Sequence, residues 1–240
     1  MVTITVNGNE IPAEPGRPIL AALRANGIRV PTLCNLDGLV PTGTCRVCLV
    51  ELESPRRLVP SCAFPVAAGM RVHTHSPWVL EARKMVVELL LVDHPDDCLY
   101  CPRNRCCELQ TLAEELGVRE RRYGLAKKVA RKDVSNPSIV RDQAKCVLCG
   151  RCVRTCQDVQ TVSAIEFAGR GAHARIATAF DGSLNLSTCI NCGQCIAVCP
   201  TAALTEQSAI AQVEGALDDP ERIVVVQHAV DALDDVDHRV

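Results

Sequence analysis

Cysteines at the spacings of metal ligands set the chemistry of this sequence. The chain has 240 residues and 16 cysteines, far more than a packed core requires. One stretch alone, DHPDDCLYCPRNRCCELQ at residues 93–110, holds four cysteines and a histidine. An iron–sulfur or zinc site takes four ligands, so one of these five side chains is surplus. The order of the remaining cysteines is the best guide to what the sites do.

Two copies of one cysteine pattern lie in the C-terminal half of the chain. The first run is Cys146-x2-Cys149-x2-Cys152-x3-Cys156, and the second is Cys189-x2-Cys192-x2-Cys195-x3-Cys199-Pro200. This internal repeat is the signature of a two-cluster ferredoxin, in which the fourth cysteine of each run ligates the other cluster. The predicted ligands are therefore Cys146, Cys149, Cys152 and Cys199 for one 4Fe-4S cluster, and Cys189, Cys192, Cys195 and Cys156 for the second.

The N-terminal residues have the pattern of a small α+β domain. VTITV at residues 2–6 alternates apolar and polar side chains, and the following Asn7-Gly8 is a strong hairpin signal. After Pro18, the segment ILAALRAN has helical periodicity, with Gly27 at the expected C-terminal end. Four more cysteines follow in loops rich in Gly, Pro and Thr, where free backbone N–H groups point readily at cluster sulfurs. A zinc ribbon, which also contains a CxxC pair, remains an alternative at this point.

These cysteines lie in a stretch with a specific resemblance. PTLCNLDGLVPTGTCRVCLVEL followed by SCAFPVAAGMRVHTHSP resembles the 2Fe-2S domain that opens the large iron–sulfur subunit of NADH dehydrogenase complexes and the multicluster iron-iron hydrogenases. The resemblance implies a β-grasp ferredoxin-like fold. It also implies 2Fe-2S ligand roles for Cys34, Cys45, Cys48 and Cys62.

The stretch at residues 93–110 resembles a second site of the same family. His94-x3-Cys98-x2-Cys101-x5-Cys107 followed by ELQ is similar to its His-plus-three-Cys 4Fe-4S site, which makes Cys106 the surplus residue. A neutral imidazole in place of a thiolate removes one negative charge and shifts the cluster potential upward. Two alternatives stay open: His94 as an ordinary helix-end histidine bonded to a carbonyl, and Cys106 as the fourth ligand.

The predicted cofactors are one 2Fe-2S cluster and three 4Fe-4S clusters, whose ligand sets use every cysteine except Cys106. Disulfides are the competing explanation for so many cysteines. Cysteines at x2 and x3 spacings pair poorly with each other, and MVTITVNGNE lacks the pattern of a signal peptide. We therefore expect a reducing, cytoplasmic environment.

Composition and motifs predict an α+β chain of five segments. We expect a 2Fe-2S ferredoxin-like domain at 1–78 and a small helical 4Fe-4S domain with histidine and cysteine ligands at 79–118, which begins with a helix at 79–92. A basic connecting arm at 119–137 then leads to a bacterial-type two-4Fe-4S ferredoxin domain at 138–208 and an acidic tail at 209–240. The arm includes Arg121, Arg122, Lys127 and Lys128. The arm and the tail are either solvated faces or docking surfaces for partner subunits.

Nothing else in the sequence indicates a substrate site. There is no GxGxxG after a strand and no GxxxxGK, so no nucleotide-binding loop is predicted, and no catalytic residues stand out. The net charge of −2 argues against nucleic acid, and the longest apolar run, VVELLLV, is too short to span a membrane. The remaining histidines have no ligand spacing: His73, His75, His173, His228 and His238.

The last part of the chain bears on its partners. TAALTEQSAIAQVEGALDDPERIVVVQHAV resembles the segment that joins the ferredoxin and catalytic domains of multicluster iron-iron hydrogenases and related formate dehydrogenase subunits. The resemblance implies a non-catalytic electron-transfer subunit of a soluble NAD(P)-linked oxidoreductase, electron-bifurcating or not. Its partners would be a flavin- and NAD(P)-binding diaphorase subunit and a catalytic hydrogenase or formate dehydrogenase subunit. The alternatives are an independent multicluster carrier and a truncated large subunit of a respiratory NADH dehydrogenase.

Overall fold

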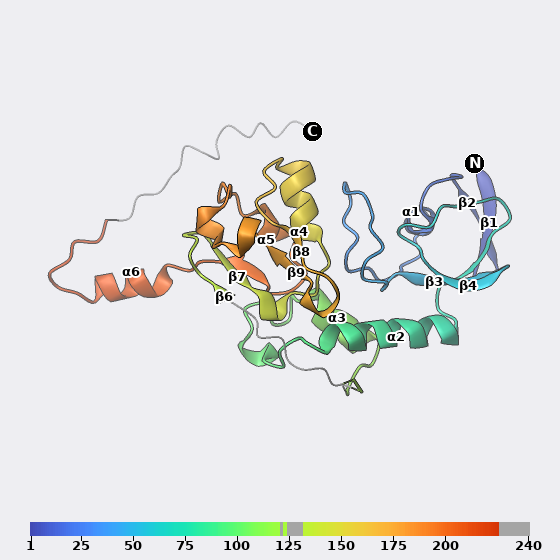
Figure 1. Cartoon of the computed structure of the whole chain (residues 1–240). Coiled ribbons are helices and arrows are strands. Elements are labelled where there is room, and N and C mark those ends of the chain that lie inside the picture. Colours follow the sequence, from blue (N-terminus) through green and yellow to red (C-terminus); the bar gives the residue numbers. More distant parts are fainter. Residues whose placement is uncertain (121, 124–131, 226–240) are drawn as a thin grey trace. The chain divides into compact units, whose positions relative to one another are not determined.

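A computed structural model describes residues 1–120, 122–123 and 132–225 (Figure 1). The chain divides into two units, Met1–Glu206 and Gln207–Val240. Of the arm residues named above, Arg121, Lys127 and Lys128 lie outside the described residues, as do His228 and His238. No helix in the described ranges is long and apolar enough to cross a membrane.

A five-stranded mixed sheet with one helix forms the N-terminal part of the first unit. The strands are β1 (Val2–Val6), β2 (Asn9–Ala13), β3 (Leu49–Glu53), β4 (Arg56–Pro60) and β5 (Arg71–His73), in the order β2-β1-β5-β3-β4. β1 pairs antiparallel with β2 across Asn7-Gly8, which confirms the predicted hairpin, and it pairs parallel with β5. Helix α1 (Ile19–Ala25) confirms the helix expected after Pro18.

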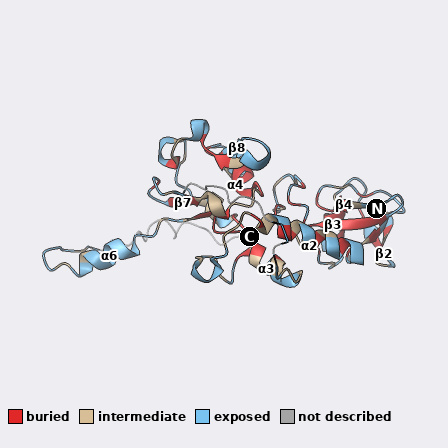
Figure 2. Ribbon diagram, turned by 60° about the horizontal axis from the view of Figure 1, so that its bottom comes forward, coloured by how far each residue is buried: buried red, intermediate tan, exposed pale blue. Residues whose placement is uncertain are grey.

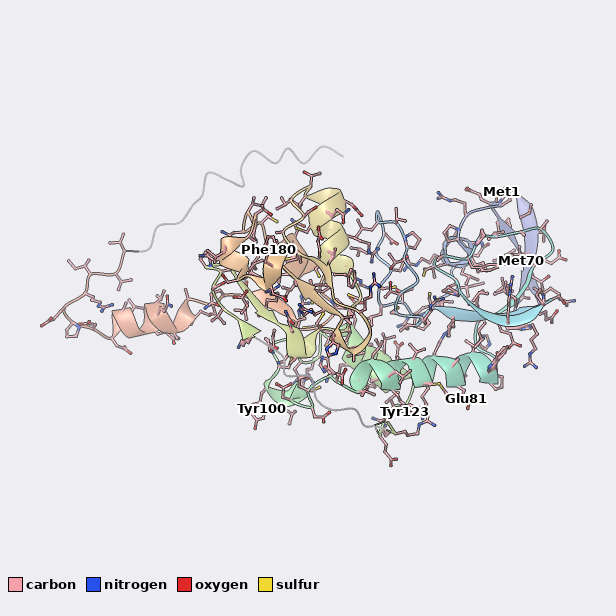
Figure 3. All side chains as sticks on the ribbon, viewed as in Figure 1. Met1, Met70, Glu81, Tyr100, Tyr123 and Phe180 are labelled. Carbon is pink, nitrogen blue, oxygen red and sulfur yellow. The ribbon has the colours of Figure 1, made fainter. Side chains whose placement is uncertain are left out.

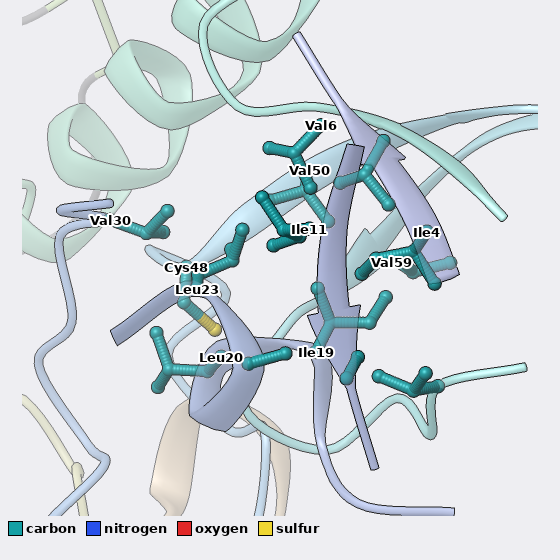
Figure 4. Close-up of a cluster of buried hydrophobic side chains, with 14 of the residues drawn as sticks. Ile4, Val6, Ile11, Ile19, Leu20, Leu23, Val30, Cys48, Val50 and Val59 are labelled. Carbon is teal, nitrogen blue, oxygen red and sulfur yellow. The ribbon is translucent and has the colours of Figure 1, made fainter. Parts of the chain in front are cut away.

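The alternation of apolar residues along β1 explains the core of this region. Ile4 and Val6 are each 1% exposed, and they face Ile19 and Leu23 of α1 within a single buried cluster (Figure 4). Cys48 and Cys62 belong to the same cluster. The sheet and its helix therefore supply most of the apolar packing, and the cysteines lie at its margin.

Helices α2 (Pro77–Leu91) and α3 (Glu108–Glu115) flank the loop that holds His94 and the cysteines predicted to join it. Helix α2, expected at 79–92, begins where the Ser76 side chain accepts a hydrogen bond from the Val79 amide at 3.3 Å. Its buried Arg83 donates to the Leu49 carbonyl at 2.5 and 3.1 Å and so holds α2 on β3, and burial lowers the pKa of Arg83 to about 10. Glu88, also buried, pairs with Arg122 of the basic arm at 2.7 Å.

The C-terminal part of the first unit is made of short elements. One sheet has the order β10-β7-β6, from Leu204–Glu206, Ile139–Asp142 and Lys132–Asp133, and a second pairs β8 (Glu166–Ala168) with β9 (Arg175–Ala177). Helix α4 (Arg151–Arg154) continues into a π-helical turn, η3 (Thr155–Val159), and α5 is Gln194–Ala197. The other single turns are η1 (Cys98–Tyr100), η2 (Gln143–Lys145), η4 (Gly171–His173), η5 (Ala179–Asp181) and η6 (Leu184–Leu186).

Burial is unevenly distributed over these elements. Every strand of the N-terminal sheet has at least one buried residue, whereas helix α6 (Ile210–Leu217) of the second unit has none and is exposed along most of its length (Figure 2). Within the C-terminal part of the first unit, Phe180 stands out from the surface (Figure 3). The described part of the acidic tail thus contributes little to any core.

Candidate metal centres

The structure brings the four predicted 2Fe-2S ligands together beside the N-terminal sheet. Cys34, Cys45 and Cys48 come from the loop before β3, and Cys62 comes from the turn after β4. All four are buried, and the Cys34 amide donates to the Cys45 sulfur at 3.3 Å. Ser61 donates to the Cys48 carbonyl through its amide at 3.1 Å and its hydroxyl at 2.8 Å, which fixes the turn that carries Cys62.

The closeness of these four sulfurs changes their acidity. Hydrogen bonds from the Cys45 and Cys62 thiols lower the pKa of Cys34 to about 2, and a hydrogen bond from Cys62 lowers the pKa of Cys48 to about 6. The pKa values of Cys45 and Cys62 rise in return, because each thiol donates a hydrogen bond to the Cys34 sulfur. The thiolate is the form that binds metal, so this cluster of sulfurs fits a site for a cationic iron centre.

The predicted ligands of the histidine-containing site lie in the loop between α2 and α3, residues 92–107, here called the His94 loop. Burial raises the pKa of Cys107, and the nearby Cys101 and Cys98 thiolates raise it further. Cys98 is exposed, and so is the neighbouring Tyr100, whose side chain points away from the body of the unit (Figure 3). The three cysteines of this set are therefore neighbours at a surface-accessible loop.

The hydrogen bond of His94 determines which ring nitrogen is available to a metal. Its Nδ1 lies 3.0 Å from the Pro95 carbonyl oxygen. Because a carbonyl only accepts, Nδ1 carries the proton, so the buried Nε2 is the ring nitrogen that a metal would bind. Metal-binding histidines commonly donate their other N–H in this way. The carbonyl bond expected of an ordinary helix-end histidine is thus present, and it leaves His94 suited to ligation.

Cys106 faces a different part of the chain. It is exposed, and its thiol donates to the Arg103 carbonyl at 3.5 Å. It lines a cavity of about 560 Å³ together with Arg29 and Thr32, and none of the four predicted ligands of the adjacent site lines that cavity. This placement agrees with Cys106 as the surplus residue of the stretch 93–110.

The four predicted ligands of the first 4Fe-4S cluster of the repeat line one cavity. Its walls include Cys146, Cys149, Cys152 and Cys199 together with apolar side chains such as Ile176 and Leu204. Burial raises the pKa of Cys149 to about 12 and raises that of Cys152 well above its usual value, and the neighbouring thiolates add to both. Four thiolates in an apolar cavity need a compensating cation, which an iron cluster provides.

The second set forms a structural copy of the first. Burial raises the pKa of Cys195 to about 12, with added contributions from the charges of Cys189, Cys192 and Cys156. In the first copy the positive-φ residues Leu148 (55°) and Gly150 (70°) flank Cys149, and in the second Asn191 (60°) and Gly193 (72°) flank Cys192. Left-handed residues turn successive backbone N–H groups toward one centre, as anion-binding nests require. The sequence repeat is therefore a repeat of backbone geometry as well.

Two basic side chains connect the candidate centres. The motifs in the sequence did not single out either of them. Lys145, beside Cys146, pairs with Asp97 of the His94 loop at 3.3 Å. Arg103 of that loop donates to the Ile196 carbonyl at 3.1 Å. The signal available in the sequence was that Lys145 and Arg103 lie within two positions of the predicted ligands Cys146 and Cys101.

A single metal ion is a poorer match to this arrangement. In the described parts of the chain, no three or more His, Cys, Asp or Glu side chains are placed to hold one metal ion. The ligands of a cluster bind different iron atoms and so need not converge on one point.

Comparison with known families and proteins agrees with the order of the sites. Residues 1–77 match the model of a 2Fe-2S iron–sulfur cluster binding domain, and residues 83–122 match the NADH-ubiquinone oxidoreductase-G iron–sulfur binding region. Two 4Fe-4S dicluster models match residues 145–203 and 182–227. The predicted kinds of cluster domain are thereby confirmed, whereas the individual ligands and the number of clusters stay predictions.

A solved structure of similar extent decides the family. A chain in a crystal structure of NAD+-reducing [NiFe]-hydrogenase in the H2-reduced state is 30% identical, with a TM-score of 0.81, and the match covers 87% of this chain and 88% of that one. The chain belongs to the same family as that chain of the hydrogenase. The chain itself has a mixed α/β architecture with regions that match 2Fe-2S and 4Fe-4S ferredoxin-like domain models.

Curated members of the family are longer than this chain. The NADP-reducing hydrogenase subunit HndD of Solidesulfovibrio fructosivorans is 48% identical over 95% of the chain, and the match covers 40% of HndD. The alpha subunit of the NADPH-Fe(3+) oxidoreductase of Geobacter sulfurreducens is 37% identical over 85% of the chain, which corresponds to 24% of that protein. The chain therefore spans less than half the length of these two relatives, both of which are subunits of oxidoreductases.

Proposed function

We propose that the chain is an electron-transfer subunit of an NAD(P)-linked multisubunit oxidoreductase of the hydrogenase or formate dehydrogenase type. The observation that carries the proposal is the gathering of four predicted ligand sets within the single unit Met1–Glu206. A bound iron–sulfur cluster supplies one-electron chemistry at each set. The chain is a relay and contributes no substrate site of its own.

The proposed assignments follow the sets that the fold brings together. The 2Fe-2S cluster is assigned to Cys34, Cys45, Cys48 and Cys62. One 4Fe-4S cluster is assigned to His94, Cys98, Cys101 and Cys107. The other two are assigned to Cys146, Cys149, Cys152 and Cys199 and to Cys189, Cys192, Cys195 and Cys156. The strand order β2-β1-β5-β3-β4 supports a β-grasp fold around the first set. Two clusters of buried apolar side chains include some of the predicted ligands, among them Cys34, Cys107 and Cys152.

The names of the relatives indicate the partners. HndD belongs to an NADP-reducing hydrogenase, and the matching solved structure is an NAD+-reducing [NiFe]-hydrogenase. We infer a flavin-bearing diaphorase subunit as one partner and a hydrogenase or similar catalytic subunit as the other, in a reducing, cytoplasmic location. Four centres in one chain favour this role over that of an independent carrier, which needs only one or two.

The test begins with iron and acid-labile sulfide analysis of the full chain after anaerobic reconstitution. About 14 iron atoms per chain are expected, the sum for one two-iron and three four-iron clusters. NADH should leave the purified chain oxidised, and should reduce it once an NADH-oxidising flavoprotein is added. Saturation with zinc and little iron would overturn the proposal, and so would direct reduction by NADH.

Copurification identifies the complex. A tagged chain expressed in its native host should bring down a flavoprotein and a catalytic subunit in fixed proportion. Recovery of the chain alone, with all its clusters and with activity as a soluble electron shuttle, would instead support the independent carrier.

A further inference from the structure

Arg154 of α4 connects two candidate centres that are far apart in the sequence. Its Nη2 donates to the Cys34 carbonyl at 2.5 Å, and its Nη1 donates to the Val40 carbonyl at 2.9 Å. Its Nε donates to the Gly150 carbonyl at 3.3 Å, within the Cys149–Cys152 turn of the first repeat. One guanidinium therefore bonds the 2Fe-2S ligand loop to the first 4Fe-4S ligand run.

The surroundings leave the charge of Arg154 uncompensated. The side chain is buried, with 9% of the residue exposed, and all three of its acceptors are backbone carbonyls. Among the residues that the structure describes, the ion pair formed by helix α4 is that of Arg151 with Glu108. A buried charge of this kind is screened far less by water and salt than an exposed one.

Arg151, one turn earlier on the same helix, shows the contrast. Its two Nη atoms donate to Glu108 at 2.5 and 2.8 Å, and Nη2 also donates to the Asn35 carbonyl at 3.2 Å. The carboxylate of Glu108 offsets the charge of Arg151. Both arginines hold the loop after Cys34 against α4, but Arg154 alone brings a net positive charge with it.

A net positive charge beside a cluster favours its reduced form. Reduction adds one negative charge to the cluster, and the potential of a cluster depends on the charges and hydrogen bonds around its ligands. Because Arg154 bonds directly to the peptide group of the ligand Cys34, the 2Fe-2S centre is the one that it affects most.

We propose that Arg154 is a positioning residue that raises the reduction potential of the 2Fe-2S centre and fixes the ligand loop 34–40 on the first 4Fe-4S run. The inference rests on the ligand sets of the proposed function. It adds a means by which the ferredoxin repeat, which carries the charge, sets the electron affinity of the 2Fe-2S site.

The experiment measures the 2Fe-2S midpoint potential of the full reconstituted chain by dithionite titration followed by paramagnetic resonance. Three variants are compared with the parent: Arg154→Gln, Arg154→Lys and Arg46→Gln. Arg46 is the matched control, because it lies between the ligands Cys45 and Cys48 but is exposed to solvent. Iron content is measured for each protein, so that a shift is interpreted only where the clusters are present.

In Arg154→Gln, the ratio of reduced to oxidised 2Fe-2S centre at a fixed ambient potential should fall about tenfold. This equals about 59 mV for a one-electron couple, and it is the order expected from a unit charge ~10 Å away at an effective dielectric constant of ~20. Arg154→Lys keeps the charge and should stay within about twofold of the parent, as should Arg46→Gln, whose charge is screened by water.

An unchanged potential in Arg154→Gln would overturn the inference, and so would equal shifts in Arg154→Gln and Arg154→Lys, because these indicate geometry without a charge effect. If Arg154→Gln fails to hold the 2Fe-2S cluster, Arg154→Lys still decides: a tenfold shift in it contradicts the proposal, and a shift within twofold supports it. A parent chain that binds no iron overturns the proposed function itself, which keeps the two failures distinct.

Discussion

The N-terminal sheet and the C-terminal ferredoxin repeat hold the same kind of ligand on very different scaffolds. The sheet has four strands of five residues and buries large aliphatic side chains, among them Ile4, Ile19 and Leu23. The repeat has strands of two to four residues, and Cys152 and Cys199 are themselves members of its buried cluster. Small domains with little apolar core depend on bound metal for stability. We infer that the sheet folds first and positions its cysteines, whereas the repeat is completed by its clusters.

Removing iron should produce the largest difference between the two regions. In the chain freed of iron and sulfide, amide hydrogens of β1 and β3 should keep their protection from exchange, and those of β7 and α4 should lose it. Binding to ligands that converge only in the folded state contributes directly to folding, on the order of 10 kcal/mol for structural metal sites. Hydrogen exchange by mass spectrometry measures both regions in one sample. Equal loss of protection in the sheet would refute the comparison.

Substitution of a single predicted ligand should test the assignment of the histidine-containing centre. His94→Ala should lose about four iron atoms and one 4Fe-4S signal, because the imidazole supplies the fourth ligand of that cluster. Cys106→Ser, the matched control from the same loop, should keep the iron and the spectrum of the parent, since its thiol donates to the Arg103 carbonyl and is outside the proposed ligand set. The reverse outcome, with the signal lost in Cys106→Ser and kept in His94→Ala, would make Cys106 the ligand.

Substitutions of buried aliphatic residues should destabilise the sheet region whether or not iron is bound, and should destabilise the repeat only when its clusters are bound. Leu23→Ala should lower the free energy of unfolding of the sheet region by about 2–5 kcal/mol, because the Leu23 side chain is fully buried and its removal leaves a cavity. Ile139→Ala removes a comparable side chain from the cluster of the repeat. In the iron-free chain, Ile139→Ala should have little further effect, because that region is already unfolded. Denaturant titration with and without iron tests both variants, and a similar cost for Ile139→Ala in the two forms would count against the comparison.

Local signals made several elements predictable from the sequence, and they are also the basis of the ligand predictions. Cysteine spacings within one loop, the Asn7-Gly8 turn and the helical periodicity of residues 79–92 involve neighbours in the chain, so the pattern carries the geometry. The contact between Arg154 and Cys34 joins positions 120 residues apart, and no local pattern encodes it. For the same reason, no local pattern predicts the ion pair between Arg122 of the basic arm and Glu88 of α2.

The smallest expected effect concerns Glu51, which ties β3 to the start of α2. Its carboxylate accepts from the Ser76 hydroxyl at 2.5 Å and from Arg56 Nε at 2.7 Å, and these two bonds lower the pKa of Glu51 below its ordinary value. A lowered folded-state pKa gives stability that is present above the unfolded pKa and is lost as the pH falls through the folded pKa. Glu51→Gln should therefore be less stable than the parent by about 1–2 kcal/mol at pH 7.

This stability gap should close as the pH falls below about 4, because protonation removes the charge that the two donors stabilise. The measurement is the difference in unfolding free energy between parent and Glu51→Gln at a series of pH values, so that the acid sensitivity common to both proteins cancels. Arg56→Gln removes one of the two donors and should keep part of the pH dependence, since the Ser76 bond remains. A gap that stays constant or widens on acidification would mean that the Glu51 charge contributes nothing to the junction between the sheet and α2. The sheet would then owe its independence from the clusters to its apolar core alone.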